Sequence, residues 1–209
     1  MFNVCPACGL YAEEKAIDPA GPYAICPHCG YRHRFRRLPL FVITGASGSG
    51  KTTVCLGLSA TMSECIFMES DILWRSEFAT QAEGYHSYRN LWLRVAKNIS
   101  QAGRSVVLCG SAIPEQFEGC AERRYLSAVH YLAMVCDGDV LADRLRARPA
   151  WRQSSDTSFV EEMVRFNQWL LDCADKTNPP MALLDNTHLS VEQAMAVTRR
   201  WILSGLALG

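Results

Sequence analysis

The chain has 209 residues, of which 49% are hydrophobic and 20% are charged, and its formal net charge is zero. This length and composition are enough for one full-sized domain with a small second one, and they exclude an intrinsically disordered protein. Because the net charge is zero, no global field attracts nucleic acid or an acidic membrane, and any such attraction would have to be local.

The cysteines and the apolar segments bear on the cellular compartment. No apolar run reaches the roughly 20 residues that cross a bilayer, and the first residues do not resemble a signal peptide. We therefore expect a cytoplasmic protein with no membrane partner. The ten cysteines divide into two close pairs near the N-terminus and six single residues in apolar segments, where they are expected to behave as small core residues. Composition is silent on the oligomeric state.

The first motif is a repeated knuckle, Cys-Pro-x-Cys-Gly, at residues 5–9 and 26–30. Tetrahedral Zn²⁺ takes four thiolates at about 2.3 Å, and two tight knuckles supply that geometry. The predicted zinc ligands are Cys5, Cys8, Cys26 and Cys29. The pattern resembles zinc ribbons, so we expect a ribbon over residues 1–38. Two disulfides or a redox dithiol are the alternatives, and His28 is taken as a bystander because the cysteines fill the shell.

An arginine stripe follows the second knuckle. Arg32, Arg34, Arg36 and Arg37 are interleaved with aromatic residues before Pro39. Such a stripe could hold a phosphate backbone. It is also typical of a last ribbon strand with a solvated face, and we favour that interpretation.

The central motif is a P-loop, G-x-x-x-x-G-K-[ST], at residues 45–52. It follows an apolar strand at 41–44 and precedes a helical segment, so its N–H groups are expected to surround an anion at a helix N-terminus. The expected nucleotide-binding residues are Gly45, Ser47, Gly48, Ser49, Gly50, Lys51, Thr52 and Thr53. Lys51 would reach the β- and γ-phosphates of ATP, and the Thr52 hydroxyl would ligate Mg²⁺.

Strand and helix patterns alternate from residue 41 to the C-terminus, which predicts a parallel sheet covered on both faces. Strands are expected at 41–44, 65–69, 105–109, 128–135 and 181–184. Helices are expected at 51–62, from Ser70 or Asp71, and at 88–101, 114–124, 139–148, 157–172 and 190–203, the last with a capping box. The fold class is therefore α/β, a three-layer P-loop fold over residues 39–209.

A carboxylate near the Mg²⁺ and the attacking oxygen is needed for phosphoryl transfer. A guanine-reading Asn-Lys-x-Asp is absent, and the strand at 105–109 ends without an acid, which argues against GTPases and hydrolytic motors. Asp71 follows the strand at 65–69, at the edge where open α/β sheets bind ligands, and is a candidate base. Its alternative role is a helix N-cap, although Ser70 could serve instead.

From Phe41 to the C-terminus the chain resembles the P-loop kinases of small molecules, a group that includes nucleoside and nucleotide, gluconate and shikimate kinases. The resemblance implies the sheet order 2-3-1-4-5, contact between Asp71 and the phosphoryl acceptor, and adenine held mainly by backbone near residues 185–188. It also implies a lid around 148–156 in which Arg148 and Arg152 close over the transferred phosphoryl group. Arg144 shares their spacing but also fits a solvated helix end.

These observations predict an ATP-dependent phosphotransferase that uses Mg²⁺, carries Zn²⁺, and acts on a small acceptor. A nucleoside or nucleotide is favoured over a sugar acid, although residues 74–86 match no acceptor signature. The alternative is a nucleic-acid-binding ATPase or polynucleotide end-kinase that uses the arginine stripe. A third possibility is that the P-loop binds nucleotide for stability alone. A zinc ribbon is not a standard part of these kinases, so it either docks structurally or recruits a partner.

Overall fold

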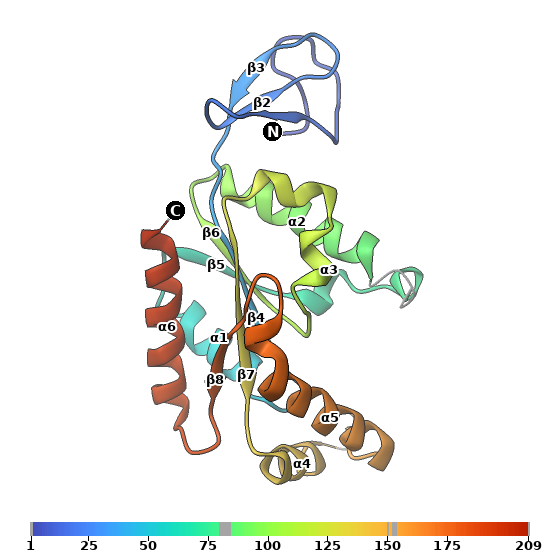
Figure 1. Cartoon of the computed structure of the whole chain (residues 1–209), viewed down its shortest axis with the longest axis vertical. Helices are drawn as coiled ribbons and strands as arrows, with labels where there is room; N and C mark the ends of the chain where they lie inside the picture. Colours follow the sequence, from blue (N-terminus) through green and yellow to red (C-terminus); the bar gives the residue numbers. More distant parts are fainter. Residues whose placement is uncertain (1, 80–84, 150, 152–153, 209) are drawn as a thin grey trace.

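The structure is a computed structural model, and it describes residues 2–79, 85–149, 151 and 154–208. It contains a small antiparallel sheet and a larger parallel one, with the small sheet at the end where the central strand of the larger one begins (Figure 1). We call residues 2–38, which carry the small sheet, the N-terminal module. Its strands are β1 (Ala16–Asp18), β2 (Tyr23–Ile25) and β3 (Arg32–Arg34), in the order β1-β2-β3.

The large sheet has five parallel strands. They are β4 (Leu40–Thr44), β5 (Cys65–Glu69), β6 (Ser105–Cys109), β7 (Val129–Val135) and β8 (Ala182–Asp185). Their spatial order, β5-β6-β4-β7-β8, confirms the predicted order 2-3-1-4-5 and the α/β fold class. Every residue of β4 and β6 is buried, because helices cover both faces of the sheet.

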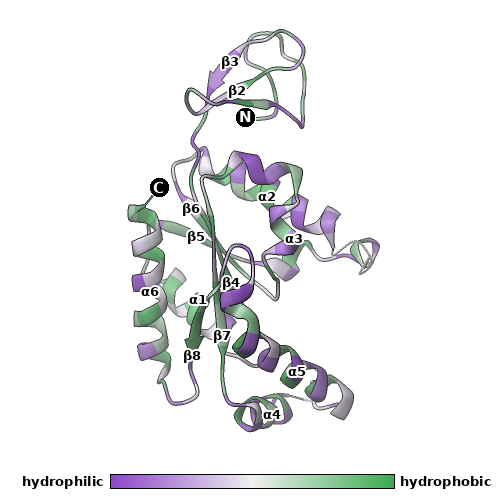
Figure 2. Ribbon diagram, in the orientation of Figure 1, coloured by the Kyte–Doolittle hydropathy of each residue, from purple (hydrophilic) through white to green (hydrophobic). Residues whose placement is uncertain are grey.

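Helices cover the sheet in two layers (Figure 1). One face carries α1 (Lys51–Ser59) and α6 (Val191–Ala207), and the other carries α2 (His86–Ser100), α3 (Glu115–Glu118) and α5 (Thr157–Cys173), with α4 (Gly138–Arg146) packed beside α5. The strands of the sheet are coloured as mainly hydrophobic in Figure 2, whereas most helices show both colours. This is the pattern of helices that bury one side and solvate the other.

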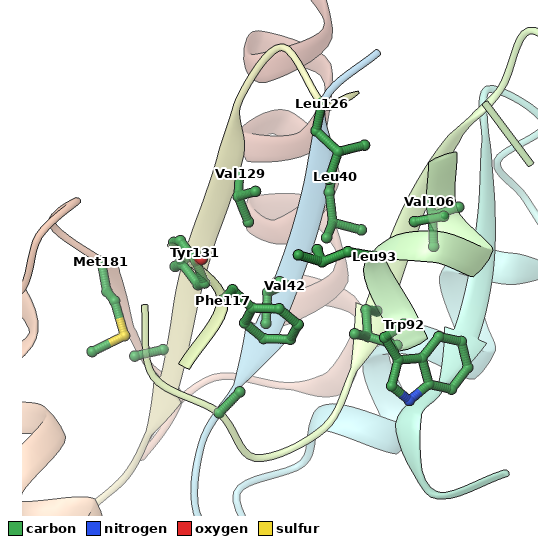
Figure 3. Packing of buried hydrophobic residues seen from close by; sticks show 14 of the residues in the cluster. Leu40, Val42, Trp92, Leu93, Val106, Phe117, Leu126, Val129, Tyr131 and Met181 are labelled. Atoms are coloured by element: carbon green, nitrogen blue, oxygen red, sulfur yellow. The ribbon is translucent and has the colours of Figure 1, made fainter. Parts of the chain in front are cut away.

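Alternation along β4 divides the core between the two faces. Leu40 and Val42 pack against Trp92 and Leu93 of α2 (Figure 3), while Phe41 and Ile43 pack against α1 and α6. Successive side chains along β4 point to opposite faces of the sheet, as the pleat of a strand requires. Five of the six single cysteines are buried, in agreement with their expected role as small core residues, whereas the sixth, Cys173, is only half-buried.

The sequence-based expectations fail mainly where a helix is short. The predicted helix at 114–124 is broken, since α3 ends at Glu118 and a 3₁₀ segment, η4 (Ala121–Tyr125), follows. The break turns the chain so that Glu122 faces α2, where its backbone N–H donates to Asn90 and its carboxylate meets Lys97. The helix expected from Ser70 or Asp71 is a single 3₁₀ turn, η1 (Ser70–Leu73), followed by a second one, η2 (Ser76–Phe78).

Two further expectations are confirmed. Ser190 and Gln193 form the reciprocal capping box at the start of α6. β3 is the last strand of the N-terminal module, and the stripe lies on and just after it. Within the stripe, Arg32 is paired with Asp18, and the backbone of Arg36 exchanges hydrogen bonds with the Gln101 side chain. Within the described part of the chain, no helix has the length and apolarity needed to cross a membrane.

The N-terminal module docks on α2 and η4 through an aromatic cluster. Phe2 and Phe35 pack edge-on against the buried ring of Tyr125, with centroid distances of 4.8 Å and 6.2 Å. The Tyr125 hydroxyl accepts a 2.6 Å hydrogen bond from the Lys15 backbone N–H and donates to the Lys15 carbonyl at 3.1 Å. The module is therefore packed on the larger sheet's helices rather than only tethered to them.

Candidate active site

A cavity of about 830 Å³ opens at the carboxyl ends of β4, β5 and β6. This is the edge at which parallel sheets bind their ligands. The cavity is lined by the P-loop, by the segment after β5, and by Arg144 and Arg148 at the end of α4. The structure thus brings together side chains that are more than 70 residues apart in the sequence, from Lys51 and Asp71 to Arg144 and Arg148.

The P-loop, residues 45–52, joins β4 to α1, and its glycines are required by its geometry. Gly45 has φ +147°, and a Cβ on it would lie 2.3 Å from the carbonyl oxygen of Met134. Gly50 is the N-cap of α1 with φ +93°, and no side chain caps the helix within the described residues. The N–H groups of the first turn are therefore left for an anion in the cavity.

Lys51 is a half-buried cation without a negatively charged partner among the described residues. Its Nζ donates to the carbonyl oxygens of Gly45 and Ala46, at 2.8 Å each, and no carboxylate of the described residues is within ion-pair distance. Burial lowers the pKa of Lys51 to about 8, with Arg148 adding repulsion and Cys109 and Asp71 opposing the shift. A phosphate group would supply the missing charge and restore an ordinary ammonium pKa.

The hydroxyl groups of the P-loop fall into two sets. Thr52 and Thr53 are exposed and line the cavity. Ser49 is buried, and its hydroxyl has no hydrogen-bond partner within the described part of the chain. Ser47 accepts a hydrogen bond from Arg148.

Asp71 lies in η1, directly after β5, and lines the cavity. Its carboxylate accepts a 3.1 Å hydrogen bond from the Ser70 hydroxyl, and neither side chain caps η1, so the alternative N-cap role is wrong. The carbonyl of Ser70 is held by Tyr88 Oη at 2.5 Å and Trp92 Nε1 at 3.0 Å. α2 therefore holds the backbone that carries Asp71.

The arginines expected in the lid have different surroundings. Arg148 Nη1 donates to Ser47 Oγ at 3.0 Å, so it reaches the P-loop. Arg144 also lines the cavity, where its Nη1 donates to Asn186 Oδ1 at 3.0 Å. Arg152, the second arginine that the resemblance places in the lid, is outside the residues that the structure describes.

Asn186 is a cavity residue without an individual assignment in the sequence-based interpretation. Its side chain is buried, and its Nδ2 donates to the carbonyl of Ser49 at 2.7 Å, which ties the segment after β8 to the P-loop. Together with Arg144 it forms a bridge from α4 to the P-loop. The sequence alone indicated only that a polar turn, residues 185–188, follows the last strand of the sheet.

Arg89 is a second cavity residue, of which the sequence predicted only that its charge could hydrogen-bond a sugar. It lies in the first turns of α2, lines the cavity and is 5% exposed, and its Nη2 donates to the Ser111 carbonyl at 2.8 Å. The guanidinium stacks near the rings of Tyr88 and Phe117 at 5.1 Å and 5.3 Å, and burial lowers its pKa. The available signal was an arginine on the face of the predicted helix that carries Trp92, Leu93 and Ala96.

A separate cluster of thiols lies in the N-terminal module. The sulfurs of Cys5, Cys8, Cys26 and Cys29 all lie within 4.8 Å of one another, with Cys5–Cys29 at 3.7 Å and Cys8–Cys26 at 3.9 Å. Tetrahedral zinc with ligands at about 2.3 Å spaces its sulfurs by about 3.8 Å, so the residues fit this metal. The observed sulfur–sulfur distances of 3.7 Å and 3.9 Å are too long for disulfide bonds. The Cys8 backbone N–H is the main cause that lowers the pKa of Cys5 to about 6, whereas the pKa of Cys29 is raised, because burial and the neighbouring thiols outweigh the backbone N–H of Tyr31.

Taken together, the parallel sheet order and the P-loop cavity define the fold of P-loop kinases. No protein-family model matches the chain, and no curated protein matches it in sequence. Solved structures do match. An unliganded sugar kinase from Janibacter sp. HTCC2649 superposes with a TM-score of 0.60 at 19% identity, over 79% of this chain and 94% of that one.

Two other solved structures support the same fold. Deoxyadenosine kinase from M. mycoides, with bound dATP, has a TM-score of 0.53 at 11% identity, over 78% of this chain and 99% of that one. Shikimate kinase from Acinetobacter baumannii, in complex with shikimate, has a TM-score of 0.51 at 18% identity, over 81% of this chain and 96% of that one. These similarities are to the fold, and the kinases concerned act on chemically different acceptors.

Proposed function

We propose that this protein is an ATP-dependent phosphotransferase that moves the γ-phosphate of ATP to a hydroxyl or phosphate of a small molecule. The observation that carries the proposal is the cavity, in which the P-loop, a carboxylate and arginines converge. A P-loop alone indicates nucleotide binding, whereas a carboxylate across from it provides a place for an acceptor.

Each of these residues has a role in the proposal. The N–H groups of the P-loop and Lys51 hold the β- and γ-phosphates. Thr52 holds Mg²⁺, which neutralises phosphate charge when it is bound. Asp71 orients the acceptor hydroxyl and accepts its proton, and Arg148 with Arg152 stabilises charge on the transferred group and excludes water.

The acceptor end of the cavity favours a nucleoside or nucleotide over a sugar acid. Trp74 is exposed and lines the cavity, and its ring lies 5.7 Å from that of Tyr85 and 5.2 Å from that of Tyr88. An exposed aromatic ring in a cavity can stack on a base, while the same ring in a core would be covered. This placement supports the proposal because Trp74 is not part of the buried core.

The N-terminal module is proposed to be a zinc ribbon that the four cysteines close around Zn²⁺. The tight thiol cluster supports this assignment, and we propose that the protein works in the cytoplasm, where single cysteines stay reduced. The division into a ribbon at 1–38 and a kinase domain at 39–209 is part of the same proposal. The packing of Tyr125 against the module supports a structural role for the ribbon.

The test is ADP release with Mg-ATP across nucleosides, nucleoside monophosphates, sugar acids and a 5′-hydroxyl oligonucleotide. We expect one small acceptor to stimulate turnover, and Asp71→Asn to reduce it by about 10²- to 10⁴-fold, the usual share of a general base. Asp143→Asn is the matched control, because that carboxylate is exposed and lies on α4 outside the cavity lining. Turnover that Asp71→Asn leaves unchanged would contradict the proposal.

The same panel of acceptors also tests the alternative function, a nucleic-acid-binding ATPase or polynucleotide end-kinase. Stimulation by the oligonucleotide alone would make the arginine stripe the substrate-binding element. Its binding should then fall steeply with salt and with the joint change of Arg34, Arg36 and Arg37 to Ala.

A further inference from the structure

Arg89 is a buried cation without a counterion. It is 5% exposed, and no carboxylate of the described residues pairs with it. Its Nε is buried and has no hydrogen-bond partner within the described part of the chain. A buried charge is costly unless it is paired and hydrogen-bonded, so an arginine left in this state requires an explanation.

The surroundings of Arg89 hold its guanidinium in place without neutralising it. One nitrogen donates to the carbonyl of Ser111, directly after β6, and the rings of Tyr88 and Phe117 flank the group. Ring faces and a carbonyl oxygen are weak partners for a cation compared with a carboxylate. They fix the position and leave the charge available.

The location of Arg89 identifies the part of the cavity that it serves. It lines the same cavity as Asp71 and Trp74, while Lys51 and Arg148 contact the P-loop side. α2 connects Arg89 with Asp71, since the Tyr88 hydroxyl, next to Arg89, donates to the carbonyl of Ser70, next to Asp71. Arg89 and Asp71 are thus held in one structural unit at the acceptor end.

We propose that Arg89 is the anion anchor of the acceptor site, and that it binds a carboxylate or phosphate on a molecule whose hydroxyl faces Asp71. The inference rests on the proposed function only in taking this end of the cavity as the acceptor site. It narrows the acceptor to anionic molecules, such as nucleoside monophosphates or sugar acids, and disfavours neutral nucleosides and sugars. Planar guanidinium suits both anions because it forms two parallel hydrogen bonds.

The experiment measures binding by calorimetry, with Mg-ADP saturating the P-loop. Matched pairs of probes differ only in the anion: a nucleoside 5′-monophosphate against its nucleoside, and gluconate against glucitol. We expect the wild type to bind one anionic member at least tenfold more tightly than its neutral counterpart. The pair that shows this preference tells phosphate from carboxylate.

Arg89→Met should remove the preference for the anionic probe. Its affinity for the anionic member should fall by about 10- to 100-fold, which is the usual contribution of a hydrogen bond to a charged group. Its affinity for the neutral member should stay unchanged. Arg89→Lys keeps the charge and should retain part of the preference, which protects the test if the methionine variant folds poorly. Arg75→Met is the matched control, because Arg75 is exposed and absent from the cavity lining.

Three results would overturn the inference: an anion preference that persists in Arg89→Met, tighter binding of the neutral member, or no binding of any probe by a protein that binds Mg-ADP. Because binding is measured without turnover, failure of the proposed function is a separate result. A protein that binds the anionic probe through Arg89 but transfers no phosphate would retain the anchor and lose the kinase assignment.

Discussion

Buried or half-buried cations occur in two regions of this protein, and their bonding partners differ. At the junction between the N-terminal module and α2, Lys97 is fully buried and its Nζ lies 2.5 Å from Glu122. In the cavity, Lys51 and Arg89 are bonded only to carbonyl oxygens. The difference teaches that a paired buried cation holds two parts of the structure together, whereas a cation without a carboxylate partner that also lines a cavity is available to an anionic ligand. Burial without a carboxylate is not enough by itself, because Lys15 of the module is 1% exposed and donates only to the Phe2 carbonyl, away from the cavity.

α2 carries residues of both regions. Its first turns supply Tyr88 and Arg89 to the cavity, and its last turns supply Arg94 and Lys97 to the junction. Arg94 joins the two parts, since it donates to Glu122 at 2.9 Å and to both oxygens of Glu13 in the module. A single helix of 15 residues therefore contacts the module at one end and the candidate acceptor site at the other.

The largest effect should come from removing the zinc proposed for the module. Structural zinc sites contribute about 10–16 kcal/mol of apparent binding energy, and a module of this size has little core of its own. Cys26→Ser should leave the module disordered while the large sheet stays folded, because the sheet's core is formed by other residues. Hydrogen exchange of residues 2–38 and zinc content are the measurements.

Cys173→Ser is the control for this change, since Cys173 is a single, half-buried cysteine at the end of α5. Unchanged exchange over residues 2–38 in a zinc-free protein would show that docking alone stabilises the module.

Glu122→Gln should have the next largest effect, because it leaves Lys97 buried without its counterion. We expect a loss of about 3–5 kcal/mol in the free energy of unfolding, measured by denaturant titration. Glu118→Gln is the comparison, since the pair that it forms with Arg123 is more exposed and should contribute less. Equal losses from the two variants would remove the distinction between buried and exposed pairs.

The cavity should respond to pH through its affinity for ATP, which distinguishes it from the junction, where burial also lowers the pKa of Lys97 but no ligand binds. The pKa of Lys51 is lowered from 10.5 to about 8, so the ligand-free protein carries an unfavourable buried charge below about pH 8. Its stability should rise between about pH 8 and 10.5, where the unfolded chain binds the extra proton. ATP affinity should change in the opposite sense, falling by up to about tenfold per pH unit above about 8.

Calorimetric ATP titrations from pH 7 to 10 measure this effect, and Lys51→Met should abolish the pH dependence along with most of the affinity. A flat affinity profile in the wild type would contradict the role of Lys51 as the unpaired cation of the cavity.

Tyr125→Phe tests the neutral part of the junction and should cost about 1–3 kcal/mol, since the buried N–H of Lys15 loses its acceptor. Thermal unfolding of this variant is compared with Tyr11→Phe, which alters an exposed hydroxyl and should have little effect. A loss in Tyr125→Phe no larger than in the control would mean that only ring packing matters at this position.

The smallest effect is expected from Arg124→Ala. Arg124 lies 3.7 Å from Glu14 of the module, and both side chains are exposed. Exposed pairs contribute about 0–1 kcal/mol, so the free energy of unfolding should hardly change. A loss comparable to that in Glu122→Gln would show that burial does not decide the strength of these pairs.

The sequence by itself determined the features whose pattern lies within a short stretch of chain. The P-loop, the two knuckles, β5 and β6 with their observed bounds, and the capping box at Ser190 were all predictable. Their spacing is set by backbone geometry and by hydrogen bonds between residues a few positions apart. The strand order followed from a resemblance that these same motifs carry.

Only the tertiary structure decided which polar residues came to lie in the cavity and which in the junction. Arg89 and Lys97 are both cations on the buried side of α2, eight residues apart, and nothing in the local pattern tells them apart. Glu122 reaches Lys97 because the chain breaks its helix after α3, and no carboxylate of the described residues reaches Arg89. Counterions come from segments distant in sequence, so the charge of a site is settled by packing rather than by periodicity.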